Sequence, residues 1–201
     1  MALILSIDII EGMNKIDGRK QRSKKSQKLI VESMIKLIEK GNLYPTAKEV
    51  ADESGIAIRT VFRQFADLET LTCKADEVIH QRLLSEKNVI KSSSPLANRL
   101  IDLIDERIKL YSKYENILLS TMTSIPRNKF LQKKYPEYQK LLKIRTEEML
   151  PEILKLDRYD QELIDATLSF IFWERLKLQG LLNKDIKIAL IKQCKKIFDL
   201  N

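Results

Sequence analysis

The sequence predicts an all-α protein of about nine helices. Apolar residues recur at three- and four-residue intervals along most of the chain, which is the spacing of amphipathic helices, and no segment alternates as a strand does. Glycine and proline, five of each in 201 residues, stand mostly where this spacing is interrupted. With 44% hydrophobic and 32% charged residues, the composition is that of a globular protein.

The chain begins with an apolar stretch, MALILSIDII, which we interpret as part of an N-terminal extension covering residues 1–20. It has no basic segment before it and no small-residue cleavage pattern after it, and it is too short to span a bilayer. The extension is expected to be a flexible tail or an ordered addition, and Met13 is an alternative start. No run of eighteen apolar residues occurs, so we expect the protein in the cytoplasm.

The first helix is expected over about Lys25 to Lys40. Its apolar stripe consists of Ile30, Met34, Leu37 and Ile38. Residues 15–28 carry seven basic side chains against one acidic side chain. Such a run supplies phosphate contacts when it precedes a DNA-reading element, and otherwise it is a solvated, disordered segment.

Residues 46–71 predict a helix–turn–helix followed by a third helix. Thr46 and Glu49 have the spacing of a capping box, which starts a helix that ends near Ser54. Gly55 then stands where a helix often ends in a left-handed residue.

The second helix of this motif is expected to begin after Ala57, and Asp67 is expected to cap the helix that follows it. Its predicted inner stripe is Ile58, Val61 and Phe65. Its outer face carries Arg59, Thr60, Arg63 and Gln64, with Phe62 between the two faces. In a helix–turn–helix, a helix in this position is shaped to enter the major groove of DNA.

This region resembles the DNA-binding domain of the TetR family of transcriptional regulators. The matching positions are the helix from about Lys25 to Lys40, Gly41, Thr46, Val50, Ala51, Gly55, Ile56, Thr60 to Phe62, Phe65, and Glu69 to Leu71. They cover about a quarter of the chain, and several are restricted in residue type. The resemblance implies a dimeric, sequence-specific regulator of transcription. It also implies a repressor that leaves a pseudo-palindromic operator on double-stranded DNA when a small, largely apolar effector binds.

Four positions depart from the family's pattern. Ala57 stands where the family has Ser or Thr as a helix cap, and losing such a cap typically costs about 0.5–2 kcal/mol. The family usually has Tyr, His and Lys, which commonly reach the DNA backbone, where this chain has Phe62, Gln64 and Leu68. Gln64 can still donate a hydrogen bond to a phosphate, whereas Phe62 and Leu68 cannot. We therefore expect DNA binding to be weaker, or to depend on other basic residues.

The candidate DNA contacts divide into two groups. Lys48, Ile58 and Arg59 are expected at or near base edges, because Arg reads guanine bidentately and Ile58, if exposed, can meet a thymine methyl. The other candidates on this surface, expected mainly at phosphates, are Arg22, Lys24, Lys25, Thr46, Thr60, Phe62, Arg63 and Gln64.

The rest of the chain is predicted to be helical. The expected segments are Asp67 to about Val89, a helix opened by Ser94 and Pro95, about Glu115 to Thr123, Phe130 to Leu154 with a turn at Pro136, Asp160 to Gln179, and Asn183 to Leu200. The helix after Pro95 has the inner stripe Leu96, Leu100, Leu103, Ile104, Ile108 and Tyr111. We expect residues 21–75 to form the DNA-binding domain and residues 76–201 to form a domain for effector binding and dimerisation.

Residues 163–173, LIDATLSFIFW, are apolar on nearly every side. A helix of this kind must be buried on more than one side, so we expect one side to face its own core and another to face a second subunit. The interface candidates are Leu163, Thr167, Phe170, Ile171, Ile186, Leu190 and Ile197. A monomer with a large core is the alternative.

The candidates for lining an effector pocket are Leu103, Arg107, Tyr111, Met122, Tyr138, Phe170 and Trp173. Arg107 faces an anionic ligand in one interpretation; in the other, commoner case such an arginine snorkels or pairs with a nearby acid. Aromatic residues and Met at helical spacing are more often plain core than pocket.

Nothing in the sequence indicates an enzyme or a cofactor. His80 is the only histidine, so no metal site or Ser–His–Asp set can be nominated, and no glycine-rich phosphate loop appears. Cys73 and Cys194 are far apart and are expected to be free thiols. Two alternatives stay open: an adaptor protein of the same fold that has lost DNA binding, and, less favoured, a helical enzyme acting on an apolar substrate.

Overall fold

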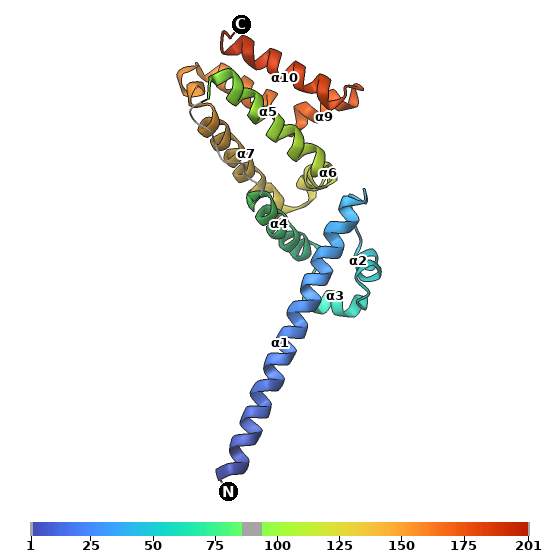
Figure 1. The fold of residues 1–201 in the computed structure, drawn as a ribbon. Coiled ribbons are helices and arrows are strands. Elements are labelled where there is room, and N and C mark those ends of the chain that lie inside the picture. The colour runs from blue at the N-terminus through green and yellow to red at the C-terminus, as the bar shows by residue number, and fades with distance from the viewer. Residues whose placement is uncertain (1, 86–93, 201) are drawn as a thin grey trace. The chain divides into compact units, whose positions relative to one another are not determined.

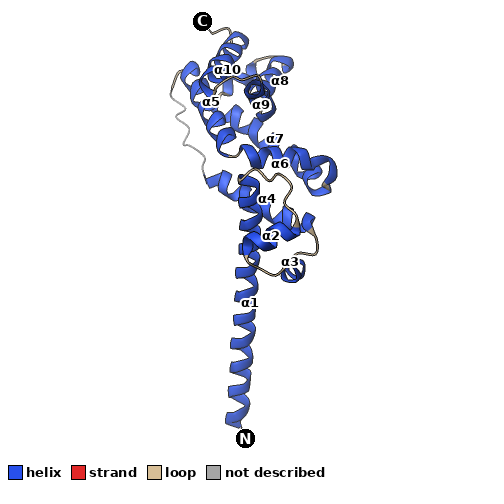
Figure 2. Ribbon diagram, turned by 90° about the vertical axis from the view of Figure 1, so that its right-hand side faces the viewer, coloured by secondary structure: helices blue, strands red, loops and turns tan. Residues whose placement is uncertain are grey.

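The computed structural model describes residues 2–85 and 94–200 (Figure 1). Ten α-helices and two short 3-10 helices occur in these ranges and no strand does, which confirms the predicted all-α class (Figure 2). The chain divides into two compact units, Met1–Leu84 and Ser85–Asn201. None of the described helices is both long enough and apolar enough to cross a membrane.

The first unit is built on one long helix. Its helices are α1 (Ala2–Glu39), α2 (Ala47–Ser54), α3 (Ile58–Gln64) and α4 (Leu68–Ser85). α2 and α3 both pack against α1 and against each other. The buried apolar side chains of this unit are Ile30, Val31, Met34, Ile35, Ile38, Ala47, Val50, Ala51, Val61, Phe65, Leu71 and Ala75.

α1 begins much earlier than the predicted start near Lys25. Its backbone is helical from Ala2, and at 1.5 Å per residue its 38 residues span about 57 Å. In Figure 1 its N-terminal part runs well past α2 and α3. The stretch before Lys25, expected to be a flexible tail or an ordered addition, is therefore continuous with the first helix. No proline precedes Pro45 to interrupt the helix.

The second unit gathers around α5. Its elements are α5 (Leu96–Lys113), α6 (Glu115–Ser124), η1 (Ile125–Arg127), α7 (Lys129–Met149), η2 (Pro151–Lys155), α8 (Arg158–Thr167), α9 (Phe170–Leu178) and α10 (Asn183–Ile197). α5 packs against α6, α7, α9 and α10. Its buried side chains include Leu100, Leu103, Ile104, Ile108 and Tyr111, which confirms most of the predicted stripe. α5 begins one residue later than predicted, after Pro95.

Two predicted boundaries in this unit are wrong. Pro136 lies inside α7 and does not open a turn. Pro136 has no N–H for the carbonyl of Gln132, but both residues are exposed, so water can reach this carbonyl. An ion pair of 2.6 Å between Lys134 and Glu137 spans the proline on the continuing helix. The single helix predicted from Asp160 to Gln179 is two helices, because Ser169 caps α9 by accepting a hydrogen bond from the Phe172 N–H.

The predicted end of α4 near Val89 lies outside the described residues. Asp67 does act as the predicted cap of α4: its carboxylate accepts a hydrogen bond of 2.7 Å from the Thr70 N–H. That hydrogen bond is the main reason that the pKa of Asp67 lies below its ordinary value.

Because of Tyr111, the free energy of unfolding of the second unit should depend on pH in the alkaline range. Its hydroxyl donates a hydrogen bond of 2.7 Å to the Leu168 carbonyl, and burial raises the pKa of Tyr111 from 10.0 to about 12. A group whose pKa is higher in the folded than in the unfolded state adds to the free energy of unfolding. This contribution is fully present below the unfolded-state pKa and is lost as the pH rises through the folded-state pKa. Between pH 10 and 12 the wild type should lose about 2 kcal/mol more unfolding free energy than Tyr111→Phe does. Urea titrations at several pH values measure this difference, and parallel curves would contradict it.

Candidate nucleic-acid interface

The start of α2 and the turn after it are built by local side-chain chemistry. The Thr46 hydroxyl accepts a hydrogen bond from the Glu49 N–H, and the Glu49 carboxylate accepts one of 2.7 Å from the Thr46 N–H, which confirms the capping box. This bond from the Thr46 backbone is the main cause that lowers the pKa of Glu49. At the other end Gly55 has a φ of 67°, and its N–H bonds back to the last turn. Gly55 to Ala57 therefore redirect the chain into α3.

The rotation of α3 about its own axis is set by contacts with the rest of the first unit. Val61 is the one α3 side chain that is fully buried, and Phe65, the residue that ends the helix, is buried beside it. The Ser23 hydroxyl of α1 donates a hydrogen bond of 2.9 Å to the side-chain oxygen of Gln64. This bond commits one end of the Gln64 amide to α1, so only its NH₂ group is left to donate to a phosphate.

The opposite side of α3 is exposed. Arg59 and Arg63 lie on it, and Phe62 and the 44% exposed Ile58 lie between it and the buried side. The predicted inner position of Ile58 is therefore wrong. Three residues at 100° each place Ile58 only 60° from Val61 around α3, at the edge of the buried side, so the contact of α3 with α1 is narrower than the predicted stripe. Thr60 is half-buried at the edge, where it lies 3.5 Å from the Arg63 guanidinium.

α2 adds little to this surface beyond Lys48. Lys48 is exposed on the first turn of α2. The Thr46 hydroxyl, a candidate for phosphate binding, donates its hydrogen to the Glu49 carboxylate at 2.7 Å, so it serves the helix cap. Ala57 makes no side-chain hydrogen bond at the start of α3, which confirms the missing cap.

The basic run before α3 is helical. Arg22, Lys24 and Lys25 are all exposed on α1, at different angles around it. Arg19 and Lys20 belong to the predicted basic run but are not among the individually predicted DNA contacts; they stand one turn before Ser23 and share its face. Because Ser23 contacts α3, these two cations lie on the side of α1 that faces α3. The helical spacing from Ser23 is the signal that would have identified them.

The candidate effector residues in the second unit are mostly packed core. Leu103, Tyr111, Phe170 and Trp173 are buried, and the three aromatic rings lie with centroids 5.5–5.9 Å apart. Met122 is half-buried, with its sulfur 4.0 Å from the hydroxyl of Tyr135, and Tyr138 is half-buried on α7.

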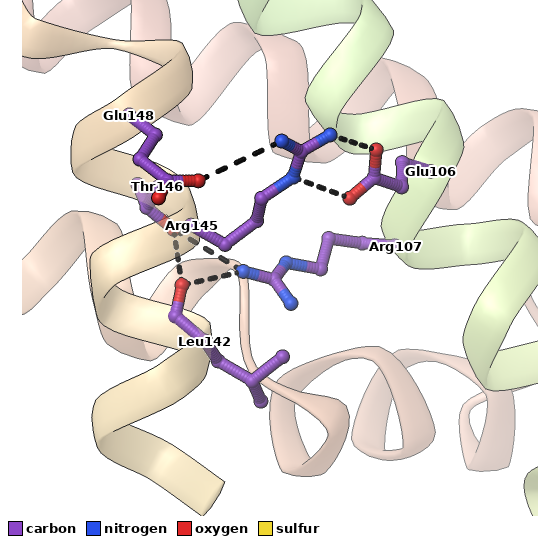
Figure 3. A network of polar contacts seen from close by, with 6 residues as sticks. All are labelled: Glu106, Arg107, Leu142, Arg145, Thr146 and Glu148. Carbon is purple, nitrogen blue, oxygen red and sulfur yellow. Dashed lines mark hydrogen bonds and ion pairs between the residues drawn. The ribbon is translucent and has the colours of Figure 1, made fainter. Parts of the chain in front are cut away.

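Arg107 is only 3% exposed and links α5 to α7 (Figure 3). Its guanidinium donates hydrogen bonds to the Leu142 carbonyl at 2.8 Å and to the Thr146 hydroxyl at 3.3 Å. Beside it, Arg145 makes two hydrogen bonds, of 3.0 and 2.8 Å, to the Glu106 carboxylate. Arg107 thus neither snorkels to solvent nor pairs with an acid among the described residues. It binds a backbone carbonyl instead.

The dimer candidates fall into two sets. Thr167, Phe170, Ile186 and Leu190 bury their side chains in the core of their own unit, where a partner cannot reach them. Ile197 is half-buried, whereas Leu163 and Ile171 are exposed. The exposed large apolar side chains of α8 to α10 and the turn before α10 are Tyr159, Leu163, Ile171, Phe172, Leu178, Leu182 and Ile188.

Cys73 and Cys194 are free thiols, and burial raises the pKa of Cys194 to about 12. Within the described residues, no three His, Cys, Asp or Glu side chains are placed to hold a metal ion. No protein-family model matches the sequence, and no curated protein matches it.

Restoring the missing cap of α3 should stabilise the first unit. Ala57 has φ −54° and ψ 135°, an extended conformation from which a serine side chain can accept a hydrogen bond from the first turn. We expect Ala57→Ser to raise the unfolding free energy by about 0.5–1 kcal/mol, measured by urea denaturation. Ala66→Ser, which adds the same hydroxyl at an exposed position outside the helix start, is the control and should have little effect. Equal effects of the two substitutions would argue against a capping deficit at Ala57.

Proposed function

We propose that this protein is a sequence-specific DNA-binding regulator of transcription, and that α3 is its recognition helix. The observation that carries the proposal is the outward side of α3. Arg59 and Arg63 lie there in solvent, on a short helix that follows α2 through a tight left-handed turn at Gly55. A helix placed in this way can enter the major groove, and arginine is the side chain that most often reads guanine there.

The charges around α3 support a polyanionic partner. α3 contains two arginines and no acidic residue, and Lys48 of α2 is exposed nearby in the same motif. Arg19 and Lys20 add charge on the side of α1 that faces α3. Phosphate neutralisation by such residues supplies affinity that does not depend on sequence, and the arginines of α3 supply the selection among sequences.

The second unit is proposed to serve dimerisation and effector binding. The exposed Leu163 and Ile171 support a second copy of the chain as partner, because large apolar side chains on a surface favour association. A twofold dimer presents two copies of α3 to a pseudo-palindromic site. The regulator is proposed to be a repressor released by a small, largely apolar effector, as the resemblance to the TetR family implies.

One specific observation favours a different function. α3 exposes Ile58 and Phe62, and Leu68 at the start of α4 is also partly exposed. Together with the uncapped start of α3, this apolar surface suits a protein partner. An adaptor protein that retains the fold without binding DNA is therefore the second candidate.

Selection of genomic fragments by the purified protein, followed by footprinting at two salt concentrations, tests the proposal. A protected pseudo-palindrome whose affinity falls steeply with salt is expected. Weak binding that is the same on every sequence would overturn the regulator and favour the adaptor.

Replacing Arg59 separates base reading from phosphate binding. Arg59→Ala should weaken binding to the selected operator by about 1–3 kcal/mol and relax the preference at one base pair. Fluorescence anisotropy on the operator and on its single-base variants measures both effects. Arg158→Ala, which removes an exposed arginine at the start of α8, is the charge-matched control and should leave the preference unchanged. Equal weakening on all sequences by Arg59→Ala would make Arg59 a phosphate contact.

A further inference from the structure

Two large apolar side chains are exposed side by side on α3. Ile58 is 44% exposed and Phe62 is 50% exposed. They stand four positions apart, so they lie one above the other on the same face of the helix, with Cβ atoms about 5–6 Å apart. α3 enters the core of the first unit through Val61, which lies about 60° from Ile58 and 100° from Phe62 around the helix. About half of each side chain of the pair stays in solvent, where the two form an apolar strip.

The surroundings of this strip favour a nucleic acid as its partner. Arg59 and Arg63 repeat the four-residue spacing one position further along α3, so a ridge of two cations runs beside the apolar strip. The Ser23–Gln64 hydrogen bond holds the opposite edge of the helix against α1, which keeps both rows turned outward. A polyanion held by the two arginines brings its base edges against Ile58 and Phe62.

The major groove offers one apolar group to such a strip, the 5-methyl group of thymine. We propose, on the basis of the function proposed above, that Ile58 and Phe62 each read a thymine methyl in every half-site. The spacing of the pair corresponds to one or two base-pair steps of about 3.4 Å. The two thymines accordingly lie one or two steps apart and next to the base pairs contacted by the arginines. Phe62 is then a base-reading residue, and this role does not need the hydroxyl of the tyrosine that the TetR family usually has at this position.

Replacing thymine by deoxyuridine tests this inference on the wild-type protein, because uracil differs from thymine only by the methyl group. The probes are duplexes of the selected operator in which each thymine is replaced in turn, with binding measured by fluorescence anisotropy. At two positions of each half-site we expect binding to weaken about three- to fivefold, the effect of taking one methyl out of apolar contact. At the other thymines we expect no change.

Substitutions in the protein show which side chain contacts which thymine methyl. Ile58→Ala should bind the thymine operator more weakly and become indifferent to uracil at one of the two positions, and Phe62→Ala should do the same at the other. Leu29→Ala is the matched control, since Leu29 is a 45% exposed side chain of the same size as Ile58 on α1. It should keep the full discrimination between thymine and uracil.

The outcomes distinguish failure of the inference from failure of the proposed function. If binding is sequence-specific but does not change when any thymine is replaced by uracil, methyl reading is overturned and the proposed regulator function is retained. If no operator is selected and binding is the same on all sequences, both proposals fall and the strip is a surface for a protein.

Discussion

The surface presented by α3 depends on how one seven-residue helix is held against α1. A helix of this length is not stable alone in water, where about 12–15 residues are needed even for good helix formers. Burial of Val61 and Phe65 contributes roughly 1.5–3 kcal/mol for each side chain, more than any intrinsic helix preference of so short a segment. The Ser23–Gln64 hydrogen bond then fixes the last turn. A rotation by one residue, 100°, would bury Phe62 in place of Val61 and move Arg59 and Arg63 into the positions that Ile58 and Phe62 now occupy.

Under the proposed function, the basic residues of α1 meet DNA as part of a helix and not as a loose arm. A disordered arm loses conformational entropy when it is fixed on DNA, whereas a helical segment has already lost it on folding. A helical segment has a shorter reach than a disordered arm, because a rigid helix cannot bend to follow a DNA groove. Among the side chains that the structure describes, the α1 cations that share the face of Ser23 are Arg19 and Lys20, and under the proposed function the others act through the general field around the unit.

Local chemistry could be predicted from the sequence wherever a few neighbouring residues determine it. The Thr46–Glu49 capping box, the left-handed Gly55 and the Asp67 cap each depend on contacts within three residues, and all three are present. The position of Ile58 could not be predicted, because it depends on how wide a contact α1 offers to α3. The break at Ser169 was hidden by the apolar residues around it, whose periodicity looks the same for one bent helix or two.

The candidate site shows the same division. Arg59 and Arg63 could be assigned to the outer face from spacing alone, since they are charged and flank Val61. Arg107 could not be assigned, because its partners are a backbone carbonyl and a hydroxyl of α7 and not an acidic side chain. Its guanidinium and the Arg145–Glu106 pair form a polar layer between α5 and α7, and the rings of Tyr111, Phe170 and Trp173 fill the space between α5 and α9. Separating a buried charged group from its hydrogen-bond partners costs more free energy than rearranging packed apolar side chains. Under the proposed function, an apolar effector therefore enters more easily on the aromatic side of α5 than between α5 and α7.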